Sequence, residues 1–120
     1  MSSNPVYQRE LHKIYLAWSD KLWQAKDWSS AAALLQKGIA LDYEQTAFYP
    51  RLLHTLLLQG QWKKAEAQWA AWQAALSEEK QVAFREVFLK DFEGLRERKV
   101  LSGEMEERYE AFLEMLEIRR

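Results

Sequence analysis

One pattern occurs twice in this chain, at a distance of 34 residues. The first copy is DWSSAAALLQKGIALD, at residues 27–42, and the second begins with QWKKAEAQW, at residues 61–69. In each copy a tryptophan, Trp28 or Trp62, is followed three positions later by alanine and four positions after that by a large apolar residue. An internal period of this length is typical of stacked helix pairs, each of which buries an apolar face against the next.

The rest of the chain also favours helices. Apolar residues recur at steps of three and four on both sides of the repeated pattern, as on one face of an amphipathic helix. Glycine (4 residues) and proline (2 residues) are scarce, which disfavours a fold of many short strands and turns. We therefore predict one all-α domain over residues 1–120, with about six antiparallel helices and no strand. The expected helices cover about residues 5–26, 27–41, 46–60, 61–76, 77–99 and 104 onward.

Several helix ends are marked by capping residues. Asn, Asp, Thr and Ser side chains accept hydrogen bonds from the unpaired amides of a first helical turn, and proline is tolerated there. We expect caps at Asn4, Asp27, Thr46 and Ser77, with a short connection at residues 42–45 and with Gly60 ending the third helix.

The apolar spacing predicts which side chains face the core. In the first helix the expected inward residues are Leu11, Ile14, Tyr15, Trp18 and Leu22. In the fifth helix they are Val82, Phe84, Val87, Phe88, Phe92 and Leu95. The six tryptophans of the chain are expected to be mostly core residues, because each buries a large area.

The repeated pattern resembles the tetratricopeptide repeat (TPR) family. The resemblance places one repeat at about residues 12–45, a second at 46–79, and a divergent repeat or capping helix pair at 80–120. The small residues Ser19, Ala31 and Gly38 match positions where the family brings helix backbones close together, whereas Leu53 and Trp72 are bulky at such positions. The resemblance implies helix hairpins stacked in a right-handed superhelix.

The same resemblance implies a function in protein–protein interaction. Stacked hairpins form a groove lined by the first helix of each pair, which suits a bound peptide or helix. We expect an adaptor or small chaperone that binds an apolar or amphipathic protein segment. The implied groove residues are Lys13, Leu16, Asp20, Trp23, Arg51, His54 and Leu57. Trp23 is the expected anchor, because it lies off the apolar stripe of its helix; the alternative is that it packs against a long terminal helix of its own chain.

Charge and composition disfavour several other classes. Seventeen basic and eighteen acidic residues leave a net charge of −1, so no net field favours nucleic acid. No apolar run reaches membrane-spanning length and no signal peptide pattern is present, so we expect a cytoplasmic protein without membrane insertion. The chain has no cysteine, which removes thiolate chemistry.

Catalytic and metal-binding patterns are weak. His12 and His54 lack the spacing of a metal site. Asp20 and His54 occupy equivalent repeat positions and are expected to form a polar or pH-sensitive contact, without an evident nucleophile beside them. We therefore expect no enzyme activity, no metal and no cofactor.

A second hypothesis places assembly at the C-terminus. In it, the chain is a structural subunit whose last two helices pair between copies to form a homodimer. The acidic residues between Glu104 and Glu117 are read as a solvated helix face with pairs four residues apart.

Overall fold

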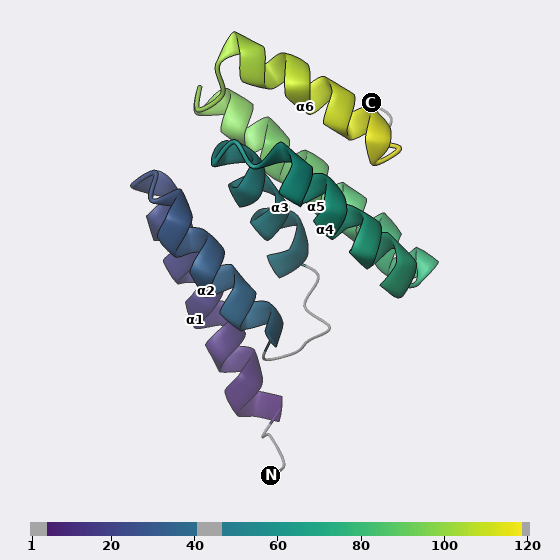
Figure 1. The fold of residues 1–120 in the computed structure, drawn as a ribbon. Coiled ribbons are helices and arrows are strands. Elements are labelled where there is room, and N and C mark those ends of the chain that lie inside the picture. The colour runs from purple at the N-terminus through teal and green to yellow at the C-terminus, as the bar shows by residue number, and fades with distance from the viewer. Residues whose placement is uncertain (1–4, 41–46, 119–120) are drawn as a thin grey trace.

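The part of the chain that the structure describes folds into six helices (Figure 1). The structure is a computed structural model that describes residues 5–40 and 47–118, and these residues contain no strand. The helices are α1 (Pro5–Gln24), α2 (Trp28–Ala40), α3 (Phe48–Leu58), α4 (Trp62–Ala75), α5 (Glu78–Glu97) and α6 (Gly103–Met115). The prediction of an all-α fold with six helices is therefore confirmed.

Side chains cap three of the helices at their first turns. Asp27 Oδ1 accepts a hydrogen bond from the Ser30 amide at 3.2 Å, and Ser77 Oγ accepts one from Lys80 at 3.3 Å. Both caps were predicted. Ser102 caps α6 in the same way, with its Oγ 3.2 Å from the Met105 amide, and this cap was not predicted. The expected caps at Asn4 and Thr46 and the connection at residues 42–45 lie outside the described residues.

Gly60 ends α3, as predicted. Its φ of 79° lies in the left-handed region, which glycine adopts without a clash from a side chain. This conformation lets the Gly60 amide donate to the Leu57 carbonyl at 3.0 Å and the Gln61 amide donate to Leu56 at 2.9 Å. The two bonds satisfy carbonyls that the end of a helix would otherwise leave unpaired.

Helix α3 lies at the centre of the fold, between the α1–α2 pair and the C-terminal helices (Figure 1). Of its eleven residues, all except Tyr49, Arg51 and Leu58 are buried. One hydrophobic cluster joins α3 to α2, α4, α5 and α6. The middle helix therefore contacts neighbours on nearly every side, which explains why its sequence is almost wholly apolar.

Small residues allow close approach where they were expected. Ser19 and Ala31 are fully buried. Gly38 of α2 lies against the ring of Phe48 in α3, so that a Cβ at Gly38 would stand only 2.9 Å from two ring carbons. Helices α2 and α3 can therefore pack at this distance only because position 38 has no side chain.

Aromatic side chains fill the core between α4, α5 and α6. Trp69 lies against Phe84 with ring centroids 4.8 Å apart, and Tyr109 of α6 stacks on Phe92 of α5 at 4.9 Å. Tyr109 and Phe112 also meet the edge of Trp62. Of the six tryptophans, three are buried, two are half-buried and Trp18 is exposed.

The prediction for the inner face of α1 is wrong in part. Ile14 and Trp18 are 55% and 53% exposed, while His12, Ser19 and Trp23 are buried. The buried face is thus rotated by about 100°, or one residue, from the expected apolar stripe. The burial of Ser19 leaves no side-chain polar group unpaired, because its hydroxyl forms hydrogen bonds.

The prediction for α5 is wrong only at Val82. This side chain is 51% exposed, while Phe84, Phe88, Phe92 and Leu95 are buried. These four residues recur at steps of three and four and so define one face, and Val82 lies two positions before that face begins.

Candidate interaction site

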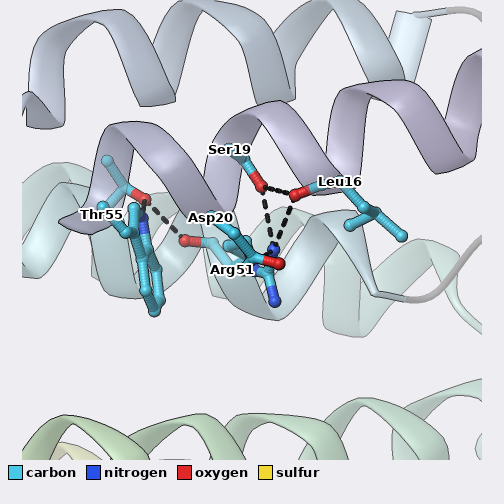
Figure 2. Close-up of polar contacts among 6 residues, drawn as sticks. Leu16, Ser19, Asp20, Arg51 and Thr55 are labelled. Atoms are coloured by element: carbon cyan, nitrogen blue, oxygen red, sulfur yellow. Dashed lines mark hydrogen bonds and ion pairs between the residues drawn. The ribbon is translucent and has the colours of Figure 1, made fainter. Parts of the chain in front are cut away.

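Arg51 of α3 joins its helix to α1 (Figure 2). Its Nη1 atom donates to the Leu16 carbonyl at 3.2 Å and to Ser19 Oγ at 2.8 Å, and it lies 2.8 Å from Asp20 Oδ1. The Arg51 side chain is 16% exposed and that of Asp20 is 55% exposed. The guanidinium group is thus mostly buried, with its acceptors gathered at Nη1 and with Nε buried without an acceptor among the described residues, whereas the carboxylate of Asp20 remains in contact with solvent.

Trp23 is held within the same group of residues. Its Nε1 donates to Thr55 Oγ1 at 3.0 Å, and the Thr55 hydroxyl donates to the Arg51 carbonyl at 2.7 Å. The Arg51 guanidinium lies over the Trp23 ring, 5.3 Å from its centroid, at a distance typical of cation–π contact. Ala31 of α2 and Leu95 of α5 complete the cluster around the indole.

The burial of Trp23 corrects the expectation that it lines an open groove. Its side chain is only 5% exposed, so a partner cannot reach the ring in this conformation. Its neighbours come from α2, α3 and α5, so the tryptophan packs inside its own chain. The alternative was that Trp23 packs against a terminal helix of its own chain. It is confirmed only in part, because α5, which contacts Trp23, is the helix before the last one.

His54 forms a second, fully buried network. Its Nε2 lies 2.9 Å from the Phe88 carbonyl and its Nδ1 lies 2.8 Å from the Tyr109 hydroxyl. A carbonyl only accepts hydrogen bonds, so Nε2 carries the proton and Nδ1 accepts from Tyr109. Burial lowers the pKa of His54 to about 3, with the backbone bond to Phe88 opposing this effect and the charge of Arg51 adding to it. The imidazole is therefore neutral near pH 7.

The expected contact between Asp20 and His54 is not formed. Asp20 pairs with Arg51 instead, and both ring nitrogens of His54 already have partners on α5 and α6. His54 touches the edge of Trp23, with ring centroids 6.1 Å apart.

Asp91 of α5 adds a carboxylate to this region. Burial raises its pKa above the ordinary value, while the charge of Arg51 lowers it and that of Asp20 raises it further. Its Oδ2 atom is buried and accepts no hydrogen bond from the described residues. Burial also raises the pKa of Tyr109, and the charge of Asp91 contributes. The charge of Asp91 is therefore coupled both to the Arg51–Asp20 pair and to Tyr109.

The seven expected groove residues are only partly brought together. Leu16, Asp20, Trp23 and Arg51 meet, with His54 behind them. Lys13 is exposed, 3.5 Å from Glu10, and Leu57 is buried in the core. Ser19 was expected only as a packing residue and Tyr109 only on the apolar face of the last helix, and Thr55 and Asp91 were not predicted. Thr55 follows Arg51 by one helical turn, and this spacing is the one signal in the sequence that links them.

Comparisons with protein-family models, with curated proteins and with solved structures gave no match. Within residues 5–40 and 47–118, no three histidine or acidic side chains are grouped so that they could hold a metal ion. No helix in this part of the chain has the length and apolar character needed to cross a membrane. A functional proposal for this chain therefore rests on its own surfaces.

Proposed function

We propose that the chain is a TPR-like protein-binding module, a cytoplasmic adaptor or small chaperone that holds an amphipathic segment of another protein. The observation that carries this proposal is the edge shared by α1 and α3. There Arg51 ties the two helices together, and the half-buried Leu16 lies beside the solvent-exposed carboxylate of Asp20. Apolar surface next to charges of both signs suits a helix or extended segment with one apolar side.

The packing of the helices supports a TPR-like stack. In such a stack the first helices of successive pairs lie next to each other, and α3 contacts both α1 and α5. The small residues at 19, 31 and 38 are buried at the points where the family requires small side chains. Leu53 and Trp72 depart from the family, and both are accommodated in the core.

Burial narrows the surface that a ligand would meet. Because Trp23, His54 and Leu57 are buried, a bound segment would contact Lys13, Leu16, Asp20 and the exposed edge of Arg51. We expect Trp23 and His54 to act indirectly, by fixing the positions of Arg51 and α3.

The test is capture of a partner from the native cell lysate with two charge-swapped proteins. Lys13→Glu/Asp20→Lys reverses two exposed charges on the proposed surface and leaves the net charge unchanged. Lys64→Glu/Glu66→Lys does the same on α4, where both side chains are exposed. We expect a partner that binds the wild type and the α4 variant but not the α1 variant.

One result would count against the proposal, and another would call for a second variant. A partner captured equally by all three proteins would show that the α1–α3 edge is not the binding surface. Loss of helicity in the α1 variant, seen by circular dichroism, would assign the effect to folding, and Asp20→Asn alone would then replace it in the assay.

The alternative function is that of a structural subunit that forms a homodimer through its C-terminal helices. Tyr109, Phe112 and Leu113 of α6 and Leu116 just after it are buried inside their own chain, so these apolar residues are not available to another copy. Met115 is 39% exposed beside a shallow depression between α4 and α6, and it is the observation that favours this alternative. Substitution Met115→Glu would separate such a dimer without removing a core residue.

A further inference from the structure

Helix α1 has a second apolar face that its own chain leaves largely uncovered. The face consists of Leu11, Ile14, Trp18 and Leu22, which we call the outer stripe. Ile14 and Trp18 are more than half exposed, and Leu11 and Leu22 are half-buried. The stripe has the three- and four-residue spacing of a core-facing helix. Among the described residues, the other large exposed apolar side chains are Val6 and Tyr7 at the start of α1, Val82 on α5 and Met115 on α6.

A depression between α1 and α2 widens this surface. It is lined by Tyr15, Trp18, Leu22, Ala33, Leu34 and Lys37. An apolar stripe along a helix with a hollow beside it provides the ridge and the groove that helix packing requires.

We propose that the outer stripe is the interface of a homodimer in which α1 packs antiparallel against α1 of a second copy. The two α1 helices would be related by a two-fold axis near residue 16. Ile14 then lies opposite Trp18 of the partner subunit, and Leu11 lies opposite Lys21 and Leu22 of the partner subunit. Each of these contacts occurs twice, as in every interface with two-fold symmetry, and the assembly closes at two copies.

Charge complementarity favours a second copy of this chain as the partner and an antiparallel direction of the two α1 helices. Glu10 and Lys21 border the stripe on the same side, near its two ends. Antiparallel packing brings Glu10 next to Lys21 of the partner subunit, whereas parallel packing would leave these two residues at different heights along the helix pair, so that they could not meet. Among the described residues, Glu10 forms an exposed pair with Lys13, at 3.5 Å, and such a pair is weak enough to be exchanged.

The proposed dimer is compatible with the proposed segment-binding surface. Asp20 follows Trp18 by two positions and therefore points to the other side of α1, about 200° away. The α1–α3 edge thus remains open in the dimer, and failure of either proposal leaves the other intact.

The first test is the mass of the wild-type protein in solution. Analytical ultracentrifugation over about two orders of magnitude in concentration should show a rise from 14.3 kDa toward twice this mass. We expect Trp18→Glu to remain a monomer throughout, and Ile14→Glu serves as a second variant if Trp18→Glu folds poorly. The matched control is Val82→Glu, which introduces the same charge at an equally exposed apolar residue on α5 and should leave the dimer intact.

The second test concerns the register. Glu10→Lys and Lys21→Glu should each weaken the dimer several-fold, because like charges then face each other. The double variant should restore it, because the pair is re-formed with its signs exchanged. If the double variant is as weak as the single variants, the antiparallel arrangement is wrong.

Two other outcomes would overturn the proposal that two copies associate through the outer stripe. A wild-type protein that is monomeric at every concentration would mean that the stripe is not a self-association surface. A dimer that survives Trp18→Glu and Ile14→Glu but is lost with Met115→Glu would place the interface on α6.

Discussion

Trp23 Nε1 and Thr55 Oγ1 lie 3.0 Å apart in a buried part of the chain, 32 residues apart in sequence. This bond satisfies the one polar atom of an indole whose side chain is only 5% exposed. Because Thr55 also donates to the Arg51 carbonyl, a single hydroxyl links α1 to two positions of α3.

The first prediction concerns this hydroxyl. Thr55→Val keeps the shape of the side chain but leaves Trp23 Nε1 without an acceptor, which should lower the free energy of unfolding by about 1–3 kcal/mol. Thr55→Ser retains the hydroxyl and should cost clearly less. Urea unfolding of the three proteins measures both effects, and equal losses for the two variants would show that the hydrogen bond is unimportant.

The second prediction compares the two members of the Arg51–Asp20 pair. Asp20 is largely solvated, so Asp20→Asn should cost less than about 1 kcal/mol. Arg51→Met removes the donor to Leu16 and Ser19, and it should cost more, about 1–3 kcal/mol. The measurement is again urea unfolding. Equal losses would mean that Arg51 stabilises the fold mainly through its salt bridge.

The third prediction uses the contact between Gly38 and Phe48. Alanine normally stabilises a helix interior by about 1 kcal/mol relative to glycine. At position 38, however, the new methyl group would lie 2.9 Å from the Phe48 ring, which is itself buried and packed edge-on against His12. We therefore expect Gly38→Ala to lower the melting temperature.

Gly94→Ala is the matched control for this substitution. Gly94 lies within α5, and a Cβ there would meet only the end of the Arg98 side chain, at 3.4 Å. This flexible side chain can move, so Gly94→Ala should raise the melting temperature. A rise for both variants would show that α2 and α3 separate readily.

Particular residues show how far the sequence predicts this structure. The helices and the caps at Asp27 and Ser77 depend on neighbours within one turn, so local sequence patterns are sufficient to predict them. The face of α1 was misjudged because Ser19 and His12 look like surface residues. Ser19 is buried against Arg51 and His12 against Phe48, and both of these partners belong to another helix. The His54–Tyr109 bond joins residues 55 positions apart, and no local spacing marks it.

The fourth prediction concerns Asp91. Its folded pKa is raised, so the contribution of this group to stability is fully present below its unfolded pKa and is lost as the pH rises through the folded value. At pH 7 the buried, charged carboxylate therefore lowers the free energy of unfolding, and its attraction to Arg51 does not offset this loss. Asp91→Asn should be more stable than the wild type at pH 7 and gain less at pH 4. Urea unfolding at the two pH values tests this, and a loss at pH 7 would show that the carboxylate is required by the fold.

The last prediction follows from the neutral imidazole of His54. Its pKa is about 3 in the folded chain and about 6.5 when unfolded. The unfolded chain therefore binds more protons below pH 6.5. The stability that His54 contributes is present above this pH and is lost as the pH falls toward 3, at about 1.4 kcal/mol per pH unit.

His54→Gln has no titrating group at this position, so its free energy of unfolding should fall less steeply between pH 6 and pH 4. The difference between the two slopes is the measurement. Parallel slopes would mean that the pKa of His54 is not lowered in the folded chain.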